Sequence, residues 1–172
     1  MRIRLHSLGL ALGLVLGSGV PELASQAAPP ATVIYLVRHA EKVDESADPE
    51  LSEAGRLRAV ELARVLSEAG ITTILSTDFR RTRGTAKPLA IALGVKVEMY
   101  DPRAPATVSR IRSLAGPILV VGHSNTAPAL VTALGGDSHG TIADNEYDRL
   151  YIVVLTGEQV TTTLLRYGAP SP

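Results

Sequence analysis

Two short apolar runs constrain the fold more than any other feature of this chain. Residues Val33–Val37 read "VIYLV", and residues 117–122 read "PILVVG". Neither run has a polar face, so each predicts a strand covered on both sides, which is typical of parallel sheets packed between helices. The first run ends abruptly in Arg38, His39 and, after one alanine, Glu41. Charge therefore begins just outside the predicted core.

Helical and strand patterns alternate along the rest of the chain. Ser52 is a favourable N-cap, alanines and leucines then recur on one helical face, and Gly70 is placed to end the helix. Pro88 lies inside the next helical pattern and predicts a kink or a late start there. The expected helices are 52–69, 81–93, 106–114 and 124–134, and the expected strands after the first are 71–77, 95–100, 117–122, 148–156 and 159–167.

This alternation predicts an α/β fold, namely a three-layer α/β/α sandwich with a mainly parallel central sheet. The last two strands are joined at Gly157 and are expected to be antiparallel. A length of 172 residues suits one domain with a real core. With 17 basic residues, 17 acidic residues and no cysteine, the chain has no signature of nucleic-acid binding. The lack of cysteine also excludes disulfides, a thiolate nucleophile and cysteine-ligated metals.

The first thirty residues form a separate unit in the sequence. Two arginines precede a short apolar run at Leu8–Val20, and small residues follow it. We therefore expect a signal peptide at 1–28, cleavage near Ala27 or Ala28, and a secreted or periplasmic domain at 29–172. The alternative is an uncleaved N-terminal anchor, which the short and glycine-rich run disfavours. No stable membrane span is expected after processing.

Two histidines each follow a predicted buried strand. His39 comes after the first strand, and His123, in "VVGHSN", comes after the strand at 117–122. Because open α/β sheets bind ligands in the crevice outside the carboxyl ends of their strands, both side chains are expected at one site. A lone histidine at a strand end is more often a hydrogen-bonded structural residue, but two in equivalent positions favour function. Without a carboxylate pair at ligand spacing, they make a poor zinc site.

Arginines gather at the same predicted edge. Arg38 precedes His39, and "STDFRRTRGTA" places Arg80, Arg81 and Arg83 where the second strand passes into a helix. A guanidinium group binds phosphate oxygens through two parallel hydrogen bonds, so this arrangement suggests a phosphoryl group as ligand. Three neighbouring arginines cannot all face one pocket, and a solvated helix face is favoured for Arg80 and Arg83.

Four short motifs follow one another along the chain: "RHA" at 38–40, "LSEAGRLRAVELA", "TDFRRTRGTA" and the pair Gly122-His123. In this order they resemble the histidine phosphatase superfamily, the phosphoglycerate-mutase-like fold, in its small single-domain branch. Ala40 stands where the family's Arg-His-Gly signature has glycine. Thr77 and Arg81 occupy the serine and arginine positions of the family's Ser-x-x-x-Arg-x-x-x-Thr-Ala motif. The resemblance covers the chain from about Val33 to at least Leu134.

The resemblance implies a mechanism for these residues. His39 would attack phosphorus and form a phosphohistidine that water then hydrolyses, while Arg38, Arg81 and His123 surround the phosphoryl group. Since fixed cations balance the charge of that group, no metal and no other cofactor is expected. His39 is expected to be unprotonated at the attacking nitrogen, whereas His123 is more useful when protonated.

The proton donor to the leaving group has two candidates in the sequence. Many relatives use a carboxylate after the third strand, where this chain has Asp101 in "EMYDPRAP", and Glu41 beside the first motif is the competitor. Asp101 is slightly favoured, although an aspartate before Pro102 is also an ordinary turn residue. Glu41 could instead pair with a basic side chain. Ser124 and Asn125 could donate to phosphate, although Ser124 is equally suited to cap a helix.

The segment between the second helix and the fourth strand is short. Larger relatives carry long insertions there that enclose sugar phosphates, so an open site is expected here. An open site suits an exported phosphomonoesterase acting on a phosphorylated small molecule or a phosphoprotein better than a mutase, which must exclude water. The alternative is a non-catalytic periplasmic module that binds a phosphorylated ligand. Turnover of a generic aryl phosphate would separate the two.

Overall fold

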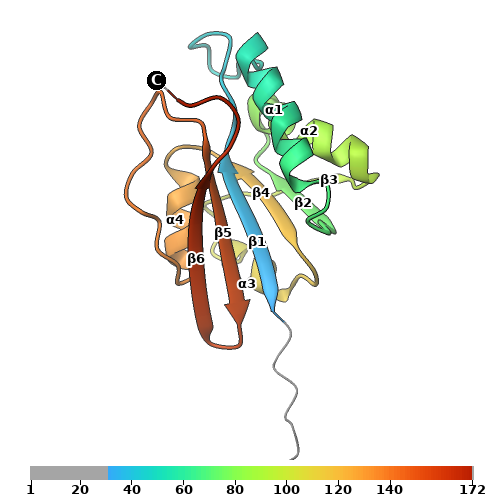
Figure 1. The fold of residues 1–172 in the computed structure, drawn as a ribbon. Helices are drawn as coiled ribbons and strands as arrows, with labels where there is room; N and C mark the ends of the chain where they lie inside the picture. Colours follow the sequence, from blue (N-terminus) through green and yellow to red (C-terminus); the bar gives the residue numbers. More distant parts are fainter. Residues whose placement is uncertain (1–30, 172) are drawn as a thin grey trace, which may run out of the picture.

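The computed structural model describes residues 31–171, so the predicted signal peptide at 1–28 lies outside the described residues. Strands and helices alternate along the chain (Figure 1), and each element lies within three residues of its expected ends. The elements are β1 (Thr32–Arg38), α1 (Glu53–Leu66), β2 (Thr73–Ser76), α2 (Arg80–Leu93), β3 (Val97–Met99), α3 (Thr107–Ser113), β4 (Ile118–Gly122), α4 (Thr126–Ala133), β5 (Arg149–Thr156) and β6 (Gln159–Arg166).

One six-stranded sheet runs through the domain in the order β3-β2-β4-β1-β5-β6. The pairs β2–β3, β2–β4 and β1–β4 are parallel. β5 runs antiparallel to β1, and β6 pairs antiparallel with β5 across the turn at Gly157, as expected. The expectation of a mainly parallel sheet is thus only partly right. Three of the five strand pairings are parallel; β5 alone runs against the others, and the hairpin turn returns β6 to their direction, so both pairings of β5 are antiparallel.

Helices cover both faces of this sheet, which gives the predicted three-layer sandwich (Figure 1). Alternate residues of β4 point to opposite faces. Val121 packs in one cluster with Leu62 of α1 and Leu89 of α2. Val120 packs in the other cluster with Ile111 of α3 and residues of α4. β4 is buried on both sides, and this explains why its sequence carries no polar position.

Helix α2 begins at Arg80, so the late start predicted from Pro88 is wrong. The proline lies in the second half of the helix and removes only the N–H that would face the carbonyl of Gly84. Gly84 has a packing reason of its own. A Cβ atom there would lie 3.2 Å from the Leu51 side chain, so glycine lets the preceding loop approach the helix. The helix ends as expected at Gly94, which is left-handed with φ 67°.

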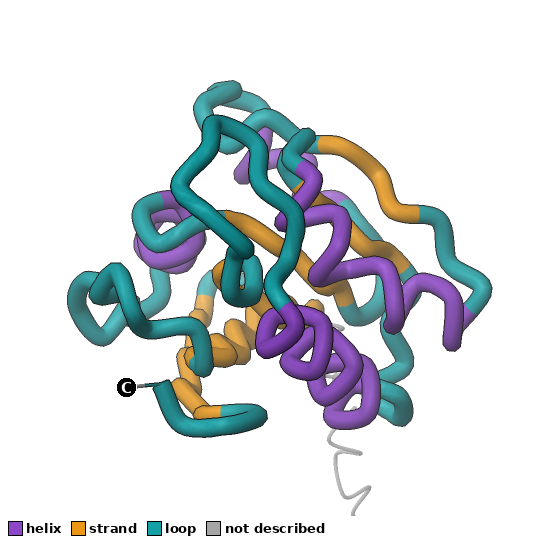
Figure 2. The backbone as a smooth tube through the Cα atoms, turned by 90° about the horizontal axis from the view of Figure 1, so that it is seen from above, coloured by secondary structure: helices purple, strands orange, loops and turns teal. Residues whose placement is uncertain are grey.

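The carboxyl ends of the four parallel strands meet at one edge of the sheet. β5 begins at the same edge, since Leu150 near its start lies opposite Val37 near the end of β1. Seen from above in Figure 2, loops lie over these strand ends. The predicted crevice is therefore formed by loops. They are residues 39–52, 77–79, 100–106, 123–125 and 134–148.

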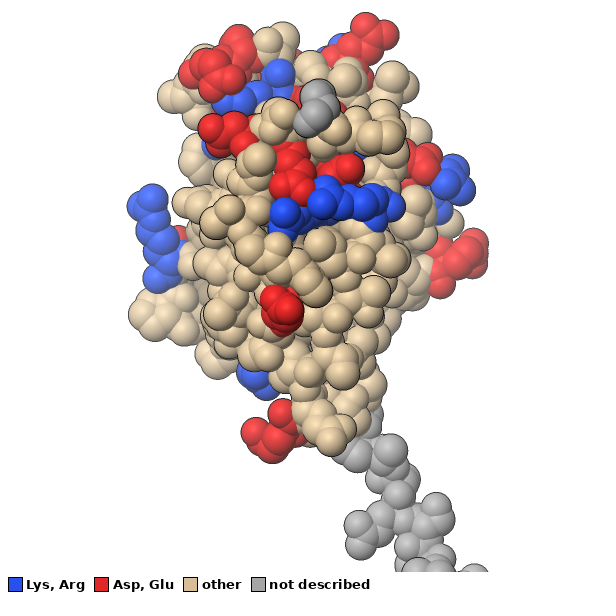
Figure 3. All heavy atoms as spheres, turned by 60° about the vertical axis from the view of Figure 1, so that its left-hand side comes forward, with Lys and Arg blue, Asp and Glu red and all other residues tan. Residues whose placement is uncertain are grey.

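Charges of both signs are mixed on the surface. On the face drawn in Figure 3, basic side chains near the top of the molecule lie directly beside acidic ones. Surface pairs such as Arg64–Glu61 and Arg110–Glu98 belong to this pattern. Within residues 31–171, no helix is long and apolar enough to cross a membrane.

Candidate active site

A pocket of about 810 Å³ opens at the carboxyl edge of the sheet. Seven of the eight predicted site residues line it, namely Arg38, His39, Arg81, Asp101, His123, Ser124 and Asn125. The other lining residues are Lys42, Ser46, Pro49, Thr77, Asp78, Phe79, Tyr100, Pro102, Arg103, Thr126 and Asp144. A second hollow of about 750 Å³, between α1 and α2, contains none of the predicted residues. The first pocket is therefore the candidate site.

His39 follows β1 and is almost completely buried, with 4% of its surface exposed. Its backbone N–H donates to the carbonyl of Gly122 (2.8 Å), which fixes it beside the end of β4. Its ring Nδ1 lies 2.8 Å from the carbonyl oxygen of Ala40. A carbonyl oxygen can only accept, so Nδ1 carries the proton and the neutral ring has its free electron pair on Nε2. His39 is thus prepared to react through Nε2.

The turn after β1 tolerates alanine where the family signature has glycine. Ala40 is fully buried, and its N–H donates to Oγ1 of Thr85 in α2 (2.9 Å). Ala40 does not have a positive φ, since His139 is the one described non-glycine residue that does. Glycine is needed at a different position, namely Gly55 in the helix motif "LSEAGRLRAVELA". A Cβ atom at Gly55 would lie 2.1 Å from the carbonyl oxygen of Glu41, so α1 can approach this turn only with glycine there.

Arg38 is held by contacts that lie far along the chain. Its Nη1 donates to the backbone carbonyls of Ala143 (2.8 Å) and Glu146 (2.9 Å). Its guanidinium carbon lies 4.1 Å from the centre of the Tyr147 ring. Its Nε–H is buried and has no hydrogen-bond partner among the described residues. Such a donor is costly to leave unpaired, and an oxygen of a bound phosphoryl group would satisfy it.

Of the three arginines at the start of α2, Arg81 lines the pocket. Its guanidinium carbon lies 4.4 Å from the centre of the Phe79 ring, and 14% of its side chain is exposed. Arg81 also lies 3.9 Å from a carboxylate oxygen of Asp48. Arg80 and Arg83 do not line the pocket; each pairs with a surface carboxylate, and 53% and 41% of their side chains are exposed. The structure therefore places one of the three arginines at the site.

His123 stands across the pocket from His39, with 5.4 Å between the ring centres. Its backbone N–H donates to Oγ1 of Thr126 (2.8 Å), and its Nε2 lies 2.9 Å from Oγ1 of Thr77. The ring of Phe79 packs edge-on against it, with 5.1 Å between centres. Thr77 and Phe79, in the loop between β2 and α2, therefore fix the imidazole, and Thr126 of α4 holds the backbone of His123.

Burial keeps both histidines neutral in the free protein. Loss of hydration, with smaller contributions from nearby arginines, lowers the pKa of His39 to about 3. The same causes lower the pKa of His123 to about 4. A neutral ring is the state that His39 needs as a nucleophile. The proton expected on His123 must therefore arrive together with an anion, which would offset the positive charge of Arg38 and Arg81.

Asp101 lies in the loop after β3 and lines the pocket. Its Oδ1 accepts from the N–H of Arg103 (2.9 Å), and its carbonyl oxygen accepts from the Thr107 hydroxyl (2.6 Å). Ser124 does not cap α4, because that helix begins after Asn125, whose side chain makes no capping hydrogen bond. Ser124 and Asn125 both line the pocket.

Glu41 requires a correction, because its carboxylate does not line the pocket. Arg58 of α1 binds it through Nε, which lies 3.0 Å from both carboxylate oxygens, and through Nη2 at 2.7 Å. Arg58 also donates to the carbonyl of Tyr167 (2.9 Å), so the ion pair ties the turn after β1 to α1 and to the chain after β6. Closeness to His39 in the sequence is misleading, since successive residues leaving a strand turn in different directions. Glu41 thus has a structural contact.

The loop 134–148 contributes groups that the sequence did not indicate. Asp144 lines the pocket, and the Tyr147 ring lies against Arg38 and 6.1 Å from the His39 ring centre. This loop carries no motif, and only the topology of the sheet brings it to the site. One feature of the sequence could have predicted this. If the C-terminal hairpin pairs with the first strand of the chain, and the leading strand of the hairpin runs antiparallel to it, the loop before the hairpin lies at the carboxyl edge of the sheet.

The pocket brings the guanidinium groups of Arg38 and Arg81 together with two neutral imidazoles, and the imidazole of His39 has a free, oriented nitrogen. Such a set binds a tetrahedral oxyanion and places a nucleophile beside it. Within residues 31–171, no group of three or more histidine, aspartate or glutamate side chains could hold a metal ion. Fold and site together define an α/β/α protein with a pocket at the carboxyl ends of its parallel strands, and the lining of that pocket is suited to an oxyanion.

Comparison with known proteins supports this class. Residues 34–102 match the model of the histidine phosphatase superfamily (branch 1). Among curated proteins, "Probable phosphoglycerate mutase GpmB" of Escherichia fergusonii is 38% identical over 77 residues, which are 41% of this chain and 35% of that protein. The match thus spans about a third of that relative's length. Over residues 34–102, the match to the family model agrees with the resemblance that the sequence motifs suggested.

Solved structures show the same fold. A Nakamurella multipartitia protein described as a candidate phosphohistidine phosphatase SixA is similar over 83% of this chain and 98% of its own, with TM-score 0.61 and 19% identity. Mycobacterial glucosyl-3-phosphoglycerate phosphatase is similar over 81% of this chain and 100% of its own, with TM-score 0.58 and 18% identity. At these identities the likeness concerns the fold alone.

Proposed function

We propose that the protein is a metal-independent phosphomonoesterase that works through a phosphohistidine at His39. One observation carries the proposal: His39, whose Nε2 is free, and Arg38, whose buried Nε–H has no partner among the described residues, line the same pocket. A nucleophile beside an unsatisfied cationic donor is suited to bind and attack a phosphoryl group. Arg81 and His123 line the same pocket and would complete the set of groups around phosphorus.

The reaction has two steps. In the first, Nε2 of His39 attacks phosphorus, the P–N bond forms and the P–O bond to the leaving group breaks, while the leaving oxygen takes a proton from Asp101. In the second, water attacks phosphorus and gives its proton to the Asp101 carboxylate. The P–N bond then breaks, inorganic phosphate leaves and His39 is restored.

Fixed positive charge stabilises both transition states. Arg38 and Arg81 are charged before the substrate binds, so they need no reorganisation as negative charge develops on the equatorial oxygens. His123 is neutral in the free protein and becomes protonated when the phosphoryl dianion binds, because the anion offsets the repulsion from the arginines. The protein itself thus supplies the charge that a metal ion supplies in other phosphoryl transfers.

The proposed substrates are phosphorylated small molecules or phosphorylated protein side chains. Support comes from the two structural neighbours, which are described as phosphatases. Between α2 and β4 this chain has only β3 and α3. No long insertion encloses the pocket there, and this favours hydrolysis over a mutase cycle that must exclude water. The curated relatives are named probable mutases, so the experiment that measures phosphate release should also measure phosphate transfer between hydroxyl groups.

A second candidate function is a module that binds a phosphorylated ligand without turnover. The position of Asp101 favours it, because that carboxylate accepts from the backbone of Arg103 rather than contacting either histidine. A generic aryl phosphate separates the two functions, since its leaving group departs without an acid. Release of nitrophenol by the purified protein in the presence of EDTA would support the phosphatase. Binding of inorganic phosphate with complete inactivity would support the binding module, and interconversion of phosphoglycerates without phosphate release would support a mutase.

We also propose that the domain is exported. The basis is the apolar run Leu8–Val20 followed by small residues before position 29. Mass spectrometry of the protein from the extracytoplasmic fraction should show an N-terminus near residue 28. Recovery of the uncleaved chain in the cytoplasm alone would contradict export and leave the catalytic proposal untouched.

A further inference from the structure

The guanidinium of Arg38 is positioned by one turn of the loop 134–148. Its Nη1 donates to the carbonyls of Ala143 and Glu146, and these belong to a single turn because the Glu146 N–H donates to the Ala143 carbonyl (3.0 Å). Tyr147, the next residue, places its ring against the guanidinium. Strand β1 therefore supplies the Arg38 backbone, while the loop sets the direction of its charged group.

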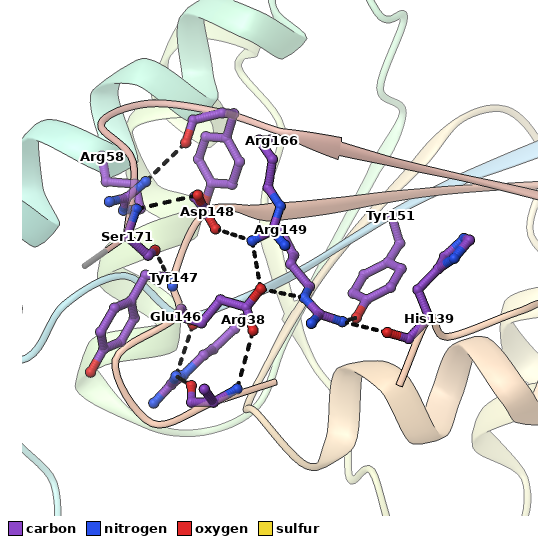
Figure 4. A network of polar contacts seen from close by, with 12 residues as sticks. Arg38, Arg58, His139, Glu146, Tyr147, Asp148, Arg149, Tyr151, Arg166 and Ser171 are labelled. Atoms are coloured by element: carbon purple, nitrogen blue, oxygen red, sulfur yellow. Dashed lines mark hydrogen bonds and ion pairs between the residues drawn. The ribbon is translucent and has the colours of Figure 1, made fainter. Parts of the chain in front are cut away.

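The carboxylate of Glu146 holds this turn in place (Figure 4). Its Oε2 accepts from the N–H of Ala143 (3.1 Å), and its Oε1 accepts from Nε of Arg149 (2.6 Å) and Nη1 of Arg166 (2.5 Å). Only 13% of the Glu146 side chain is exposed. Burial opposes ionisation, but these hydrogen bonds outweigh it and lower the pKa of Glu146 to about 2. One carboxylate thus ties the turn to both strands of the last hairpin.

Arg149 holds the earlier part of the same loop. Its Nη1 donates to the carbonyl of His139 (3.1 Å), and its Nη2 donates to the carbonyl of Thr141 (3.0 Å). Nη1 also lies 3.1 Å from the hydroxyl oxygen of Tyr151, and only 11% of the Arg149 side chain is exposed. Because Arg149 also binds Glu146, the two halves of the loop share one buried ion pair.

We propose that the Glu146–Arg149 ion pair is a positioning unit for the phosphoryl-binding arginine, an inference that rests on the proposed role of Arg38. The pair fixes the turn and the turn fixes Nη1 of Arg38, so the remaining donors of this pocket-lining arginine, among them the unpaired Nε–H, are held in a defined direction. A guanidinium has five donors in a rigid fork, so occupying one end determines where the other end points. Contacts of this kind matter because bidentate recognition of an oxyanion tolerates little misorientation.

Glu146→Gln tests the proposal with little change in volume. An amide has one acceptor oxygen where the carboxylate has two, so it cannot serve the Ala143 N–H and the two arginines together. Inorganic phosphate is the probe, with its dissociation constant measured by calorimetry. We expect phosphate binding to weaken about tenfold or more, and KM for an aryl phosphate to rise more than kcat falls.

Asp148→Asn is the matched control. Asp148 accepts from the same Nη1 of Arg166 (2.5 Å), and its side chain is 9% exposed, but among the described residues its carboxylate makes no hydrogen bond to the turn at 143–146. It should lower the melting temperature to a similar degree while leaving phosphate affinity unchanged. Equal losses of affinity in Asp148→Asn and Glu146→Gln would overturn the proposal, because both would then reflect general loosening. Should Glu146→Gln not fold, Arg149→Lys is the second variant: it keeps the charge but replaces the planar fork with an ammonium group of three donors, too few for Glu146, the two loop carbonyls and the Tyr151 hydroxyl together. Unchanged phosphate affinity there would equally overturn the proposal.

A double-mutant cycle shows whether Glu146 acts through Arg38. In an Arg38→Ala background, Glu146→Gln should weaken phosphate binding no further, whereas independent effects would multiply and contradict the proposal. Phosphate affinity is measured without turnover, so the outcomes remain distinguishable. A protein that binds phosphate but lacks activity would refute the phosphatase and leave the positioning unit standing. Wild-type affinity in Glu146→Gln would refute the positioning unit alone.

Discussion

Thr77 Oγ1 lies 2.9 Å from Nε2 of His123, and the direction of this hydrogen bond follows from a third residue. The Thr82 hydroxyl lies 2.8 Å from the Thr77 carbonyl and 2.9 Å from the Phe79 carbonyl, so its proton goes to a carbonyl oxygen. Its own oxygen then accepts from the Thr77 hydroxyl (3.1 Å). Thr77 can therefore only accept from His123, and the neutral ring carries its proton on Nε2. Nδ1 is the nitrogen left to take up a further proton.

Removing the Thr77 hydroxyl should disturb His123 without disturbing its packing. Thr77→Val leaves the Nε2–H without an acceptor in a buried place, so we expect kcat/KM to fall roughly tenfold through loss of a single hydrogen bond. Nitrogen-15 NMR of His123 should show a shift in tautomer. Thr77→Ser keeps the hydroxyl and should restore both properties. Wild-type kinetics in Thr77→Val would show that the tautomer is set by other contacts.

His39→Ala should abolish turnover while phosphate or vanadate still binds. The arginines that hold the oxyanion remain, but the nitrogen that forms the P–N bond is gone. Turnover of an aryl phosphate and calorimetric titration with phosphate measure the two properties separately. Wild-type protein quenched in alkali, where a phosphohistidine is stable, should carry a phosphoryl group that the variant lacks. A variant with wild-type rate would make the nucleophile assignment wrong.

Arg81→Ala should cost at least two orders of magnitude in kcat/KM, because a desolvated, charged contact to the transition state is lost. Arg80→Ala is the control, since its side chain pairs with Glu50 on the surface and does not line the pocket. It should change kcat/KM by less than about threefold, as expected for a surface ion pair. If Arg80→Ala were the damaging change and Arg81→Ala harmless, the motif would be assigned in the wrong register.

Residues that precede or follow buried strands were predictable from sequence, and residues brought in by topology were not. The apolar runs of β1 and β4 have no polar face, which locates His39 and His123 at the carboxyl edge of the sheet. Arg38, in contrast, is held by a loop that starts after α4, and no local pattern specifies that contact. The role of Thr77 depends on a hydroxyl chain through Thr82, which spacing alone does not reveal.

Glu41 shows the opposite error. Its place two residues after His39 suggested a role in the pocket, yet the turn after β1 directs its carboxylate to Arg58 of α1. The direction of a side chain in a turn depends on φ and ψ angles that the sequence does not fix at these positions. The requirement for glycine at position 55, which lets α1 approach this turn, is visible only once the two segments are placed together.

Acid should destabilise the fold partly through the two site histidines. Their pKa values of about 3 and about 4 lie below the ordinary 6.5, so as pH falls below about 6.5 the unfolded chain binds more protons than the folded one. Stability is thus fully present above pH 6.5 and declines toward pH 4, by up to about 1.4 kcal/mol per pH unit for each histidine. Urea titrations at pH 7 and pH 5 should show a smaller decline in His39→Gln than in the wild type. Identical declines would mean that His39 is not buried as a neutral ring.

Two carboxylates of the pocket remain as candidate donors to the leaving group once Glu41 is assigned to Arg58 and Asp78 to its ion pair with Arg83. Asp101 comes from the loop after β3, as the sequence motifs suggested, and Asp144 comes from the loop 134–148. Burial lowers the pKa of Arg38. The negative charge of Asp144 favours the charged form of Arg38 and opposes that shift, but it does not outweigh the effect of burial. Glu41→Gln should therefore lower stability without changing the response to the leaving group.

Asp101→Asn should slow the hydrolysis of alkyl phosphates by two or more orders of magnitude and barely affect aryl phosphates. Alkoxide leaving groups need a proton, whereas phenolates depart as stable anions. Asp144→Asn is the matched comparison, because it removes one charge from the same pocket without touching the loop after β3. It should change both classes of substrate by the same small factor. The reverse pattern, with Asp144→Asn selective for alkyl phosphates, would transfer the acid role to the loop that also positions Arg38. If neither variant distinguished the leaving groups, the site would have no dedicated acid, and its substrate would need a good leaving group such as a phosphoramidate nitrogen.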